Sequence, residues 1–407
     1  MRKLFVLYLC LISAVAYAQN YDKHFRDTTL RMDYILTGNA ASQQIALDRL
    51  SKMPGWYGRK HHMESLPVEG NAQLTVKDHY TGDTIYRNSA STLFQEWLTY
   101  PEAQGAARSF EQVWLMPMPK DIVDVTIELR DNRRKVTASY NHTVNPQDIL
   151  IRRIGERDIT PYEVLQKAED DAKRINIAFV AEGYTESEMD IFIRHANEAV
   201  EAIFAHEPFK SLRNRFNIIA VKAPSAENGT SEPGNGVWKN TALGSHFDTF
   251  YSDRYLTTLQ LKAIHDRLAG TPYEHIIVLV NTEKYGGGGI LNNYTLTMTR
   301  HTYFKEVVTH EFGHSFAGLA DEYAYPNDEL DMYPLDIEPW EPNITTKVNF
   351  ASKWQDMPQV GLYEGAGYRT KGIFRPTKDC RMRSNTTPDF CPVCQRAIRQ
   401  LVEFVTE

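Results

Sequence analysis

The chain has 407 residues, enough for two domains of ordinary size with a sizeable core. Apolar residues make up 42% and charged residues 24%, values typical of globular proteins, which excludes a disordered or fibrous chain. Lys and Arg number 45 against 52 Asp and Glu, so the chain lacks the basic surplus of proteins that bind nucleic acid or anionic membranes. We therefore expect no nucleic-acid partner.

Residues 1–18 have the pattern of a signal peptide. Arg2 and Lys3 precede an apolar stretch that ends in the small-x-small sequence Ala16-Tyr17-Ala18. The 15 residues of this stretch are fewer than the roughly 20 that a stable membrane span needs. We expect an exported mature protein, which is periplasmic, cell-surface or secreted, with no membrane span.

Short alternating patterns dominate the next part of the chain. Residues 73–78 and 84–87 flank Thr81-Gly82-Asp83 and predict a hairpin. A second hairpin is predicted from Val125, Ile127 and Leu129, which alternate with polar residues before a further run at 135–140. One helical stretch is expected near residues 40–52. We predict an all-β, sandwich-like domain over residues 19–159.

A domain of another kind is predicted over residues 160–407. Thr160-Pro161-Tyr162-Glu163 supplies an N-cap, a first-turn proline and a capping-box acid, which predict a helix to about Arg174. An apolar run at 175–181 predicts a buried strand, and apolar residues at helical spacing over 192–203 predict a helix. Further strands are predicted at 216–221, 275–280 and 294–298. The fold class is therefore α+β, with a mixed sheet in the second domain.

Residues 309–316 contain the pattern H-E-x-x-H. On a helix, side chains four residues apart face the same way, so His310 and His314 can reach one metal ion. Glu311 lies beside this pair, where it can act as general base toward a water at the metal. An apolar face opposite the histidines favours a helix, and it consists of Val308, Phe312 and Phe316. The pattern alone would also fit a capped helix with two surface histidines.

A catalytic zinc ion takes three protein ligands and leaves a position for water. Gly318 follows His314 by four residues and can end the helix with a positive φ, which returns the chain toward the metal. Asp321 comes three residues later and is our choice of third ligand, with Glu322 as the alternative. A ligand from a later helix would instead indicate distant glutamates such as Glu329 or Glu338.

Residues 310–323 read HEFGHSFAGLADEY and resemble the active-site segment of the immunoglobulin A peptidase family of bacterial zinc metallopeptidases, itself similar to the metzincins. The resemblance extends over about residues 175–405, through 176–184, 363–368, 379–383 and 390–394. It implies a metzincin-like α/β zinc-protease domain with an active-site helix, preceded by an N-terminal β domain. It also implies zinc on His310, His314 and Asp321, with Glu311 as base. Metzincins in general place the third ligand six residues after the second, whereas Asp321 lies seven after His314.

Met382 would correspond to the methionine turn of the metzincins, which packs beneath the metal ligands, although it would also suit an ordinary core position. Three cysteines follow the signal peptide, at 380, 391 and 394. In an oxidising compartment we expect two of them to pair and brace this turn, and the sequence does not decide which two. Cys391-x-x-Cys394 would alternatively be half of a zinc site, but no second CxxC completes it.

Four glycines, Gly286 to Gly289, do not form a phosphate loop, because no Lys-Ser/Thr follows and the run leads into a strand-like segment. We expect a mobile rim beside the cleft, where a strand can pair with an extended substrate backbone.

Together these patterns predict an exported endopeptidase, a hydrolase with one catalytic Zn²⁺ ion that acts on protein or glycoprotein substrates. One alternative is a non-catalytic surface-binding or adhesin module on the same fold. Another is a zinc amidase that acts on cell-wall peptide. The sequence does not predict the natural substrate, the role of the N-terminal domain or the oligomeric state.

Overall fold

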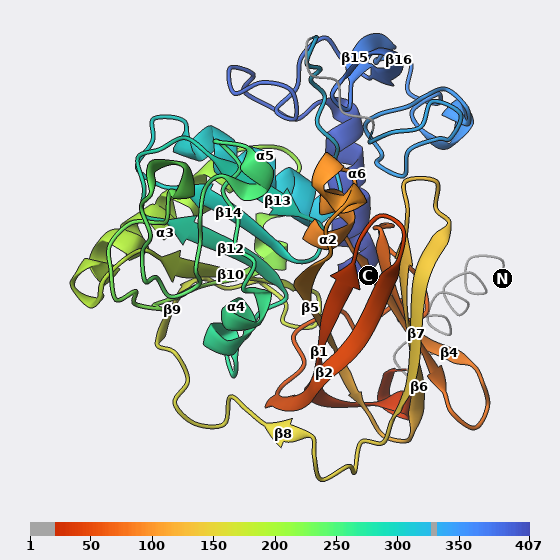
Figure 1. Ribbon diagram of the computed structural model, residues 1–407, viewed down its shortest axis with the longest axis vertical. Helices are drawn as coiled ribbons and strands as arrows, with labels where there is room; N and C mark the ends of the chain where they lie inside the picture. The colour runs from red at the N-terminus through yellow and green to blue at the C-terminus, as the bar shows by residue number, and fades with distance from the viewer. Residues whose placement is uncertain (1–20, 327–331) are drawn as a thin grey trace, which may run out of the picture.

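The computed structural model describes residues 21–326 and 332–407, so the predicted signal peptide lies outside the described residues. The chain is mixed α/β, with several sheets and few helices (Figure 1). Its first part forms two four-stranded sheets, in the orders β5-β1-β2-β8 and β4-β3-β6-β7. Their strands are β1 (Phe25–Gly38), β2 (Gln43–Pro54), β3 (Ala72–Asp78), β4 (Thr84–Ala90), β5 (Arg108–Pro119), β6 (Val123–Arg130), β7 (Val136–Val144) and β8 (Arg152–Arg153).

Both predicted hairpins are present. β3 pairs with β4, and β6 pairs with β7, in each case antiparallel. Val125, Ile127 and Leu129 are fully buried, whereas their neighbours on β6 are partly exposed. The alternation of apolar and polar residues therefore corresponds to one buried and one exposed face of the strand, as strand geometry requires.

The helix expected near residues 40–52 is wrong, because this segment forms strand β2. Residues 39–42 make a turn, in which the Asn39 amide donates to the Ser42 carbonyl at 2.8 Å. β2 then pairs antiparallel with β1 over its whole length, from Gly38–Gln43 to Thr28–Pro54. Apolar residues such as Ile45 and Leu50 fit a helix locally, but the long β1 ladder satisfies the backbone of the segment as a strand.

The second part of the chain forms a six-stranded mixed sheet in the order β13-β14-β12-β10-β11-β9. The four inner strands are parallel, and an antiparallel strand lies at each edge. The expected strands at 216–221, 275–280 and 294–298 are all present. The sheet consists of β9 (Tyr162–Gln166), β10 (Ile175–Glu182), β11 (Phe216–Val221), β12 (His275–Val280), β13 (Gly287–Ile290) and β14 (Tyr294–Met298).

The helix expected from Thr160 to about Arg174 is also wrong. Tyr162 to Gln166 form the edge strand β9, which pairs antiparallel with β11. The side chains of Tyr162, Glu163 and Val164 are exposed, as the edge position allows. The capping residues are therefore present without a helix, because pairing with β11 supplies the backbone partners that a helix would have supplied.

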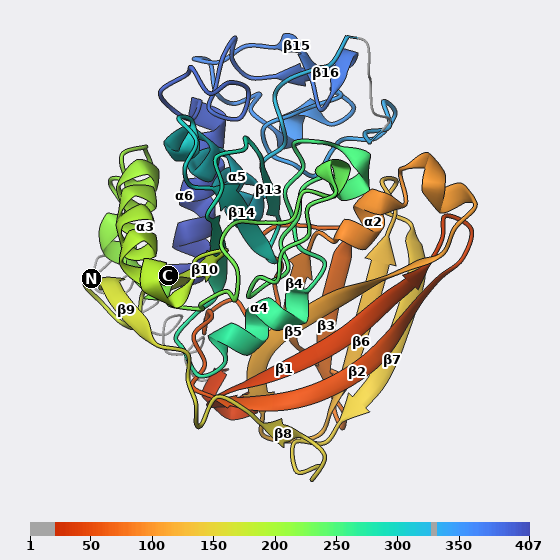
Figure 2. The ribbon, with the colours of Figure 1, turned by 60° about the vertical axis from the view of Figure 1, so that its left-hand side comes forward.

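Both faces of the six-stranded sheet are covered, which explains its continuous apolar strands. On β10, Ile177 and Phe179 pack with the helices on one side, while Ala178 and Val180 belong to a core shared with the N-terminal sheets. Figure 2 shows this arrangement, with α3 and α6 on one side of the sheet and strands β1 to β7 on the other. The two parts of the chain therefore share one continuous apolar core.

The helices are α2 (Leu93–Trp97), α3 (Met189–Phe204), α4 (Leu261–Leu268), α5 (Phe304–Ala317) and α6 (Pro392–Thr406). Short 3-10 helices are η1 (Pro101–Gln104), η2 (Glu186–Glu188), η3 (Arg213–Arg215), η4 (Pro233–Asn235), η5 (Thr249–Tyr251) and η6 (Phe350–Ser352). Between α5 and α6 the chain is mostly irregular and contains the hairpin β15 (Tyr363–Ala366) and β16 (Arg369–Arg375).

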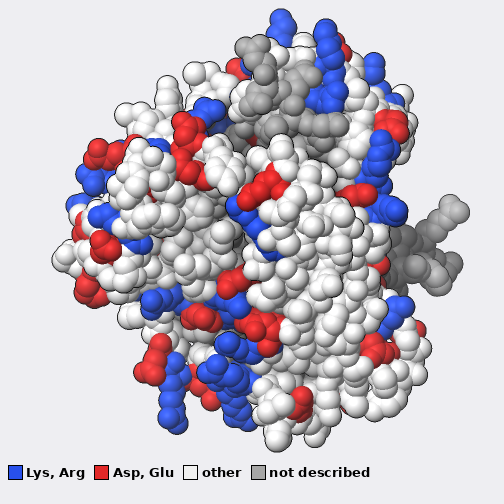
Figure 3. Space-filling model, in the orientation of Figure 1, with Lys and Arg blue, Asp and Glu red and all other residues white. Residues whose placement is uncertain are grey.

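Positive and negative side chains are interspersed on the face drawn in Figure 3. Across residues 21–326 and 332–407, no helix combines the length and the apolar character needed to cross a membrane.

Arg31 forms a buried ion pair within β1 and a second ion pair, with an exposed carboxylate, that joins the two parts of the chain. Arg31 on β1 contacts Asp33 through Nε at 2.7 Å and Asp266 on α4 through Nη1 at 2.6 Å. Arg31 and Asp33 are each only 1% exposed. Removal of one member of such a pair leaves the other charge buried without compensation.

We expect Arg31→Met to lower the free energy of unfolding by roughly 3–5 kcal/mol, because Asp33 would lose its buried partner. Urea denaturation followed by tryptophan fluorescence measures this change. Arg153→Met is the control, since Arg153 forms an exposed pair with Glu156 at 3.7 Å, and its effect should stay within about 0.5 kcal/mol. Equal effects of the two substitutions would contradict a stabilising role for the buried pair.

Candidate metal centre and active-site cleft

Helix α5 presents two different faces. Phe312 and Phe316 are buried in the core that α5 shares with α3. His310, Glu311 and His314 lie on the other side and line a cleft of about 940 Å³. The spacing of apolar and polar residues thus orients the H-E-x-x-H side chains toward the cleft, as the sequence predicts.

Three possible ligand atoms converge at this face of α5. His310 Nε2 and His314 Nε2 are 3.0 Å apart, and Asp321 Oδ1 lies 3.1 Å and 3.2 Å from them. Ligands of a tetrahedral ion at zinc–nitrogen and zinc–oxygen distances are separated by about 3.3 Å. Within the described part of the chain, Asp321 Oδ1 is buried and has no hydrogen-bond partner. The three atoms therefore fit a single divalent cation.

The outer nitrogen of each imidazole is held by a backbone carbonyl. His310 Nδ1 lies 3.0 Å from the Arg381 oxygen, and His314 Nδ1 lies 2.5 Å from the Leu319 oxygen. Because a carbonyl only accepts, both Nδ1 atoms must donate, and both Nε2 lone pairs are left free for a metal.

Gly318 reverses the chain after α5, in the way the sequence predicts. Its φ is +60°, and its amide donates to the His314 carbonyl at 3.0 Å. This left-handed residue turns the chain back, so that Asp321 reaches the histidines although it lies seven residues after His314.

The other candidate third ligands lie elsewhere. Glu322 points to the three cysteines, with Oε1 at 3.3 Å from Cys394 Sγ. Glu338 accepts from the Asn349 amide at 2.9 Å and is not part of the histidine cluster. Glu329 lies outside the described residues.

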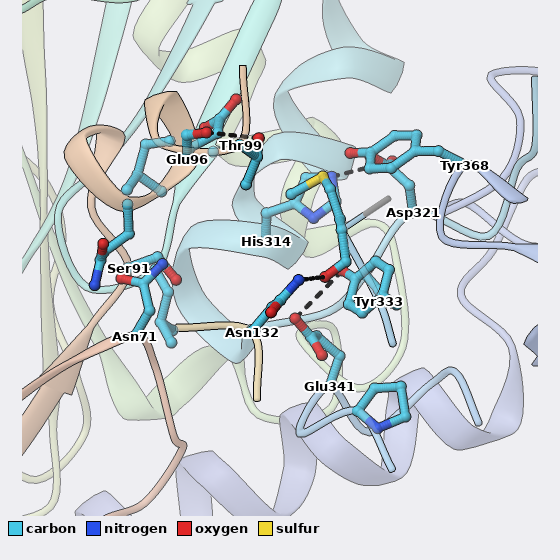
Figure 4. Close-up of a pocket in the computed structure, with 18 of the residues that line it drawn as sticks. Asn71, Ser91, Glu96, Thr99, Asn132, His314, Asp321, Tyr333, Glu341 and Tyr368 are labelled. Carbon is cyan, nitrogen blue, oxygen red and sulfur yellow. Dashed lines mark hydrogen bonds and ion pairs between the residues drawn. The ribbon is translucent and has the colours of Figure 1, made fainter. Parts of the chain in front are cut away.

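Tyr368 supports Asp321 from the side away from the histidines. Its hydroxyl donates to Asp321 Oδ2 at 2.5 Å, which leaves Oδ1 directed at the imidazoles (Figure 4). Tyr325 stacks on the Tyr368 ring with centroids 6.0 Å apart. The sequence analysis did not assign a role to Tyr368, because it is 47 residues away from Asp321.

Burial and mutual charge set the protonation of the cluster. Burial disfavours ionisation of Asp321, but the two imidazoles outweigh it and hold the pKa of this carboxyl well below its usual value. Burial likewise opposes protonation of His314, but the Asp321 carboxylate raises the pKa of His314 to about 9. Burial raises the pKa of Glu311. The Asp321 carboxylate therefore favours positive charge beside the two imidazoles.

Gly287 to Gly289 lie in the edge strand β13, which lines the cleft and packs on α5. A Cβ at Gly289 would lie 2.2 Å from the Glu311 carbonyl oxygen, and one at Gly287 would lie 3.0 Å from Glu311 Oε1. Only glycine permits this close approach of the strand to the helix. Among the described residues, the outer edge of β13 makes one isolated bridge, between Gly287 and Tyr255.

The N-terminal part forms one side of the cleft. Figure 4 shows Glu96, Thr99 and Asn132 from this part opposite His314 and Asp321. Tyr255 donates to Glu96 at 2.7 Å, and burial raises the pKa of Glu96 to about 7. Sequence reasoning missed these residues, because no local pattern relates them to α5.

Met382 is fully buried in a turn that spans residues 380–384. A Cβ at Gly313 would lie 2.7 Å from its sulfur, so Met382 packs against α5 at Gly313. The expected disulfide is not formed, since Cys380, Cys391 and Cys394 are all free thiols.

Comparison with known families gives two matches. The family described as IgA Peptidase M64 matches residues 164–359 and 355–402. The family described as Peptidase M64 N-terminus matches residues 20–141. No curated protein matches the chain.

We expect Gly289→Ala to destabilise the protein by roughly 1–3 kcal/mol, since the new methyl group would force β13 away from α5. Thermal unfolding followed by circular dichroism tests this. Gly105→Ala is the matched control, because a Cβ there meets no atom within 4 Å. An unchanged melting temperature for Gly289→Ala would contradict the proposed close packing.

Tyr368→Phe removes the hydrogen bond that orients Asp321, so we expect divalent-cation affinity to fall about 10–100-fold. Titration with Zn²⁺ against a competing chelator measures this affinity. Tyr80→Phe, at a tyrosine that is 73% exposed, should bind as wild type does. If Tyr368→Phe binds Zn²⁺ with unchanged affinity, the hydroxyl does not position the ligand.

Proposed function

The chain belongs to the IgA peptidase M64 family. From this membership, the ligand cluster and the signal-peptide pattern of residues 1–18, we propose that it is an exported, zinc-dependent endopeptidase. The observation that carries the proposal is the convergence of His310 Nε2, His314 Nε2 and Asp321 Oδ1 beside Glu311 in the cleft. Membership makes the chain a peptidase. The metal, the catalytic roles and export are our proposals.

The donor set suits zinc. Two neutral imidazoles and one carboxylate are ligands that zinc accepts, and three protein ligands leave a position open, as in catalytic zinc sites. When bound, the ion would supply Lewis acidity toward the attacking water and the scissile carbonyl. His310, His314 and Asp321 would hold it, and the Met382 side chain would form an apolar floor against Gly313.

Glu311 would act as general base. The charges of His310, His314 and Asp321 all act on its carboxylate. Its Oε1 lies beside strand β13. In this position it can take a proton from the attacking water and pass it to the leaving amine. Burial raises the pKa of the Glu311 carboxyl, whereas a bound cation would lower it.

The cleft would hold an extended protein or glycoprotein segment between the two parts of the chain. β13 lies at the edge of the six-stranded sheet and lines the cleft together with His310 and Glu311. Beyond the bridge at Gly287, an added peptide strand could pair with this edge. Tyr333 and Glu341, linked by a hydrogen bond of 3.3 Å, would face the substrate from the opposite wall.

Glu311→Gln should keep zinc and lower kcat on a peptide library about 10²–10⁴-fold, because the amide cannot accept the proton. His310→Ala should lose zinc from this cluster together with the activity. Glu198→Gln, at an exposed site on α3, should behave as wild type does.

Product mapping by mass spectrometry separates peptidase activity from the rival functions. Cleavage of cell-wall cross-links but of no library peptide would indicate an amidase. Binding of glycans without hydrolysis of any substrate would indicate an adhesin module. Either result would overturn the peptidase proposal.

A further inference from the structure

A second cluster of possible metal ligands lies apart from the histidines. It consists of Glu322, Cys380, Cys391 and Cys394, all buried, with their ligand atoms within 4.8 Å of one another. Cys391 and Cys394 belong to the start of α6, Cys380 is the first residue of the Met382 turn, and Glu322 follows Asp321. Three segments that are distant in the sequence therefore contribute to one small volume.

Three distances within the cluster match tetrahedral coordination. The sulfurs of Cys380 and Cys394 are 3.8 Å apart, and two sulfurs of a tetrahedral zinc site are about 3.8 Å apart. Glu322 Oε1 lies 3.3 Å from Cys394 Sγ and 3.9 Å from Cys391 Sγ, around the roughly 3.6 Å expected between an oxygen and a sulfur ligand. A disulfide would need sulfurs about 2.05 Å apart.

The backbone is arranged to support thiolates. The Cys391 amide donates to Cys380 Sγ at 3.2 Å, and the Cys394 amide donates to Cys391 Sγ at 3.5 Å. Cys391 is the N-cap of the 15-residue helix α6, where the helix dipole favours negative charge. Such amide–sulfur hydrogen bonds orient ligands in metal sites.

A bound metal would explain why the Glu322 carboxylate is buried in this cluster. It is fully buried, Asn343 donates to its Oε1 at 3.0 Å, and its Oε2 has no hydrogen-bond partner among the described residues. A disulfide between two of the cysteines would leave the third thiol and this carboxylate without a function in the core. A divalent cation would engage all four groups.

We propose that Glu322, Cys380, Cys391 and Cys394 bind a structural zinc ion that is separate from the His310–His314–Asp321 cluster. Binding would release the three thiol protons to solvent and leave three thiolates and one carboxylate on the ion. Four protein ligands complete the tetrahedron, so this site has no open position for water or substrate. Its function would be to join α6, the Met382 turn and the Asp321–Glu322 segment.

Metal analysis of the purified full-length chain tests this proposal. We expect two zinc ions per chain in wild type and one in either His310→Ala or Cys394→Ser. After cobalt substitution, wild type and His310→Ala should show the sulfur-to-cobalt charge-transfer absorption of thiolate ligation, and Cys394→Ser should lose it. His310→Ala is decisive, because it leaves all four ligands of the second cluster intact even if Cys394→Ser fails to fold.

Two results would overturn the proposal. One is a folded His310→Ala protein that holds no zinc and shows no thiolate absorption. The other is a disulfide among the three cysteines, seen by mass spectrometry of the unreduced protein. Neither result bears on peptide cleavage by wild type, so the peptidase proposal can stand or fall independently.

Discussion

The reversal of the chain at Gly318 is the constraint on which the histidine cluster depends. A helix can place His310 and His314 on one face, but it cannot supply a third ligand at the same point without a turn. The φ of +60° at Gly318 supplies this turn, and a Cβ there would also meet Val68 of the N-terminal part at 2.8 Å. The carbonyl of Leu319, just past the turn, then fixes the His314 ring. One glycine therefore determines both the path to Asp321 and the orientation of a ligand.

The N-terminal part is integral to this arrangement. It covers one face of the six-stranded sheet, so the apolar strands β10 and β12 are buried on both sides. The same packing brings Glu96 and Asn132 to the cleft opposite α5 (Figure 4). Since the shared core fixes the distance between the two walls, the shape of the cleft depends on residues far from the ligands.

The sequence predicted those features that depend on local patterns. Apolar runs identified β11 and β12, and an alternating run identified β14. The spacing within 310–321 identified the residues that the structure brings together. The sequence prediction failed at β2 and β9, because pairing with β1 and β11 overrides their local helical signals. Tyr368 and Glu96 could not be assigned, since only the fold brings them to α5. We expected a disulfide between two of Cys380, Cys391 and Cys394, because the sequence does not show that Glu322 lies beside them.

The two ligand clusters are linked through adjacent residues. The backbone at 321–323 runs beside residues 367–368. The Gly367 amide donates to the Asp321 backbone carbonyl, and the Tyr368 amide donates to the Tyr323 backbone carbonyl. Asp321 faces the histidines, whereas the next side chain, Glu322, faces the thiols. The Glu322 amide also donates to the Met382 carbonyl at 2.8 Å, and the neighbouring Arg381 carbonyl holds His310. A displacement of Glu322 would therefore move Asp321 directly, and it would move His310 through the 380–384 turn. The geometry of the histidine cluster thus depends on the position of the residues in the thiol cluster.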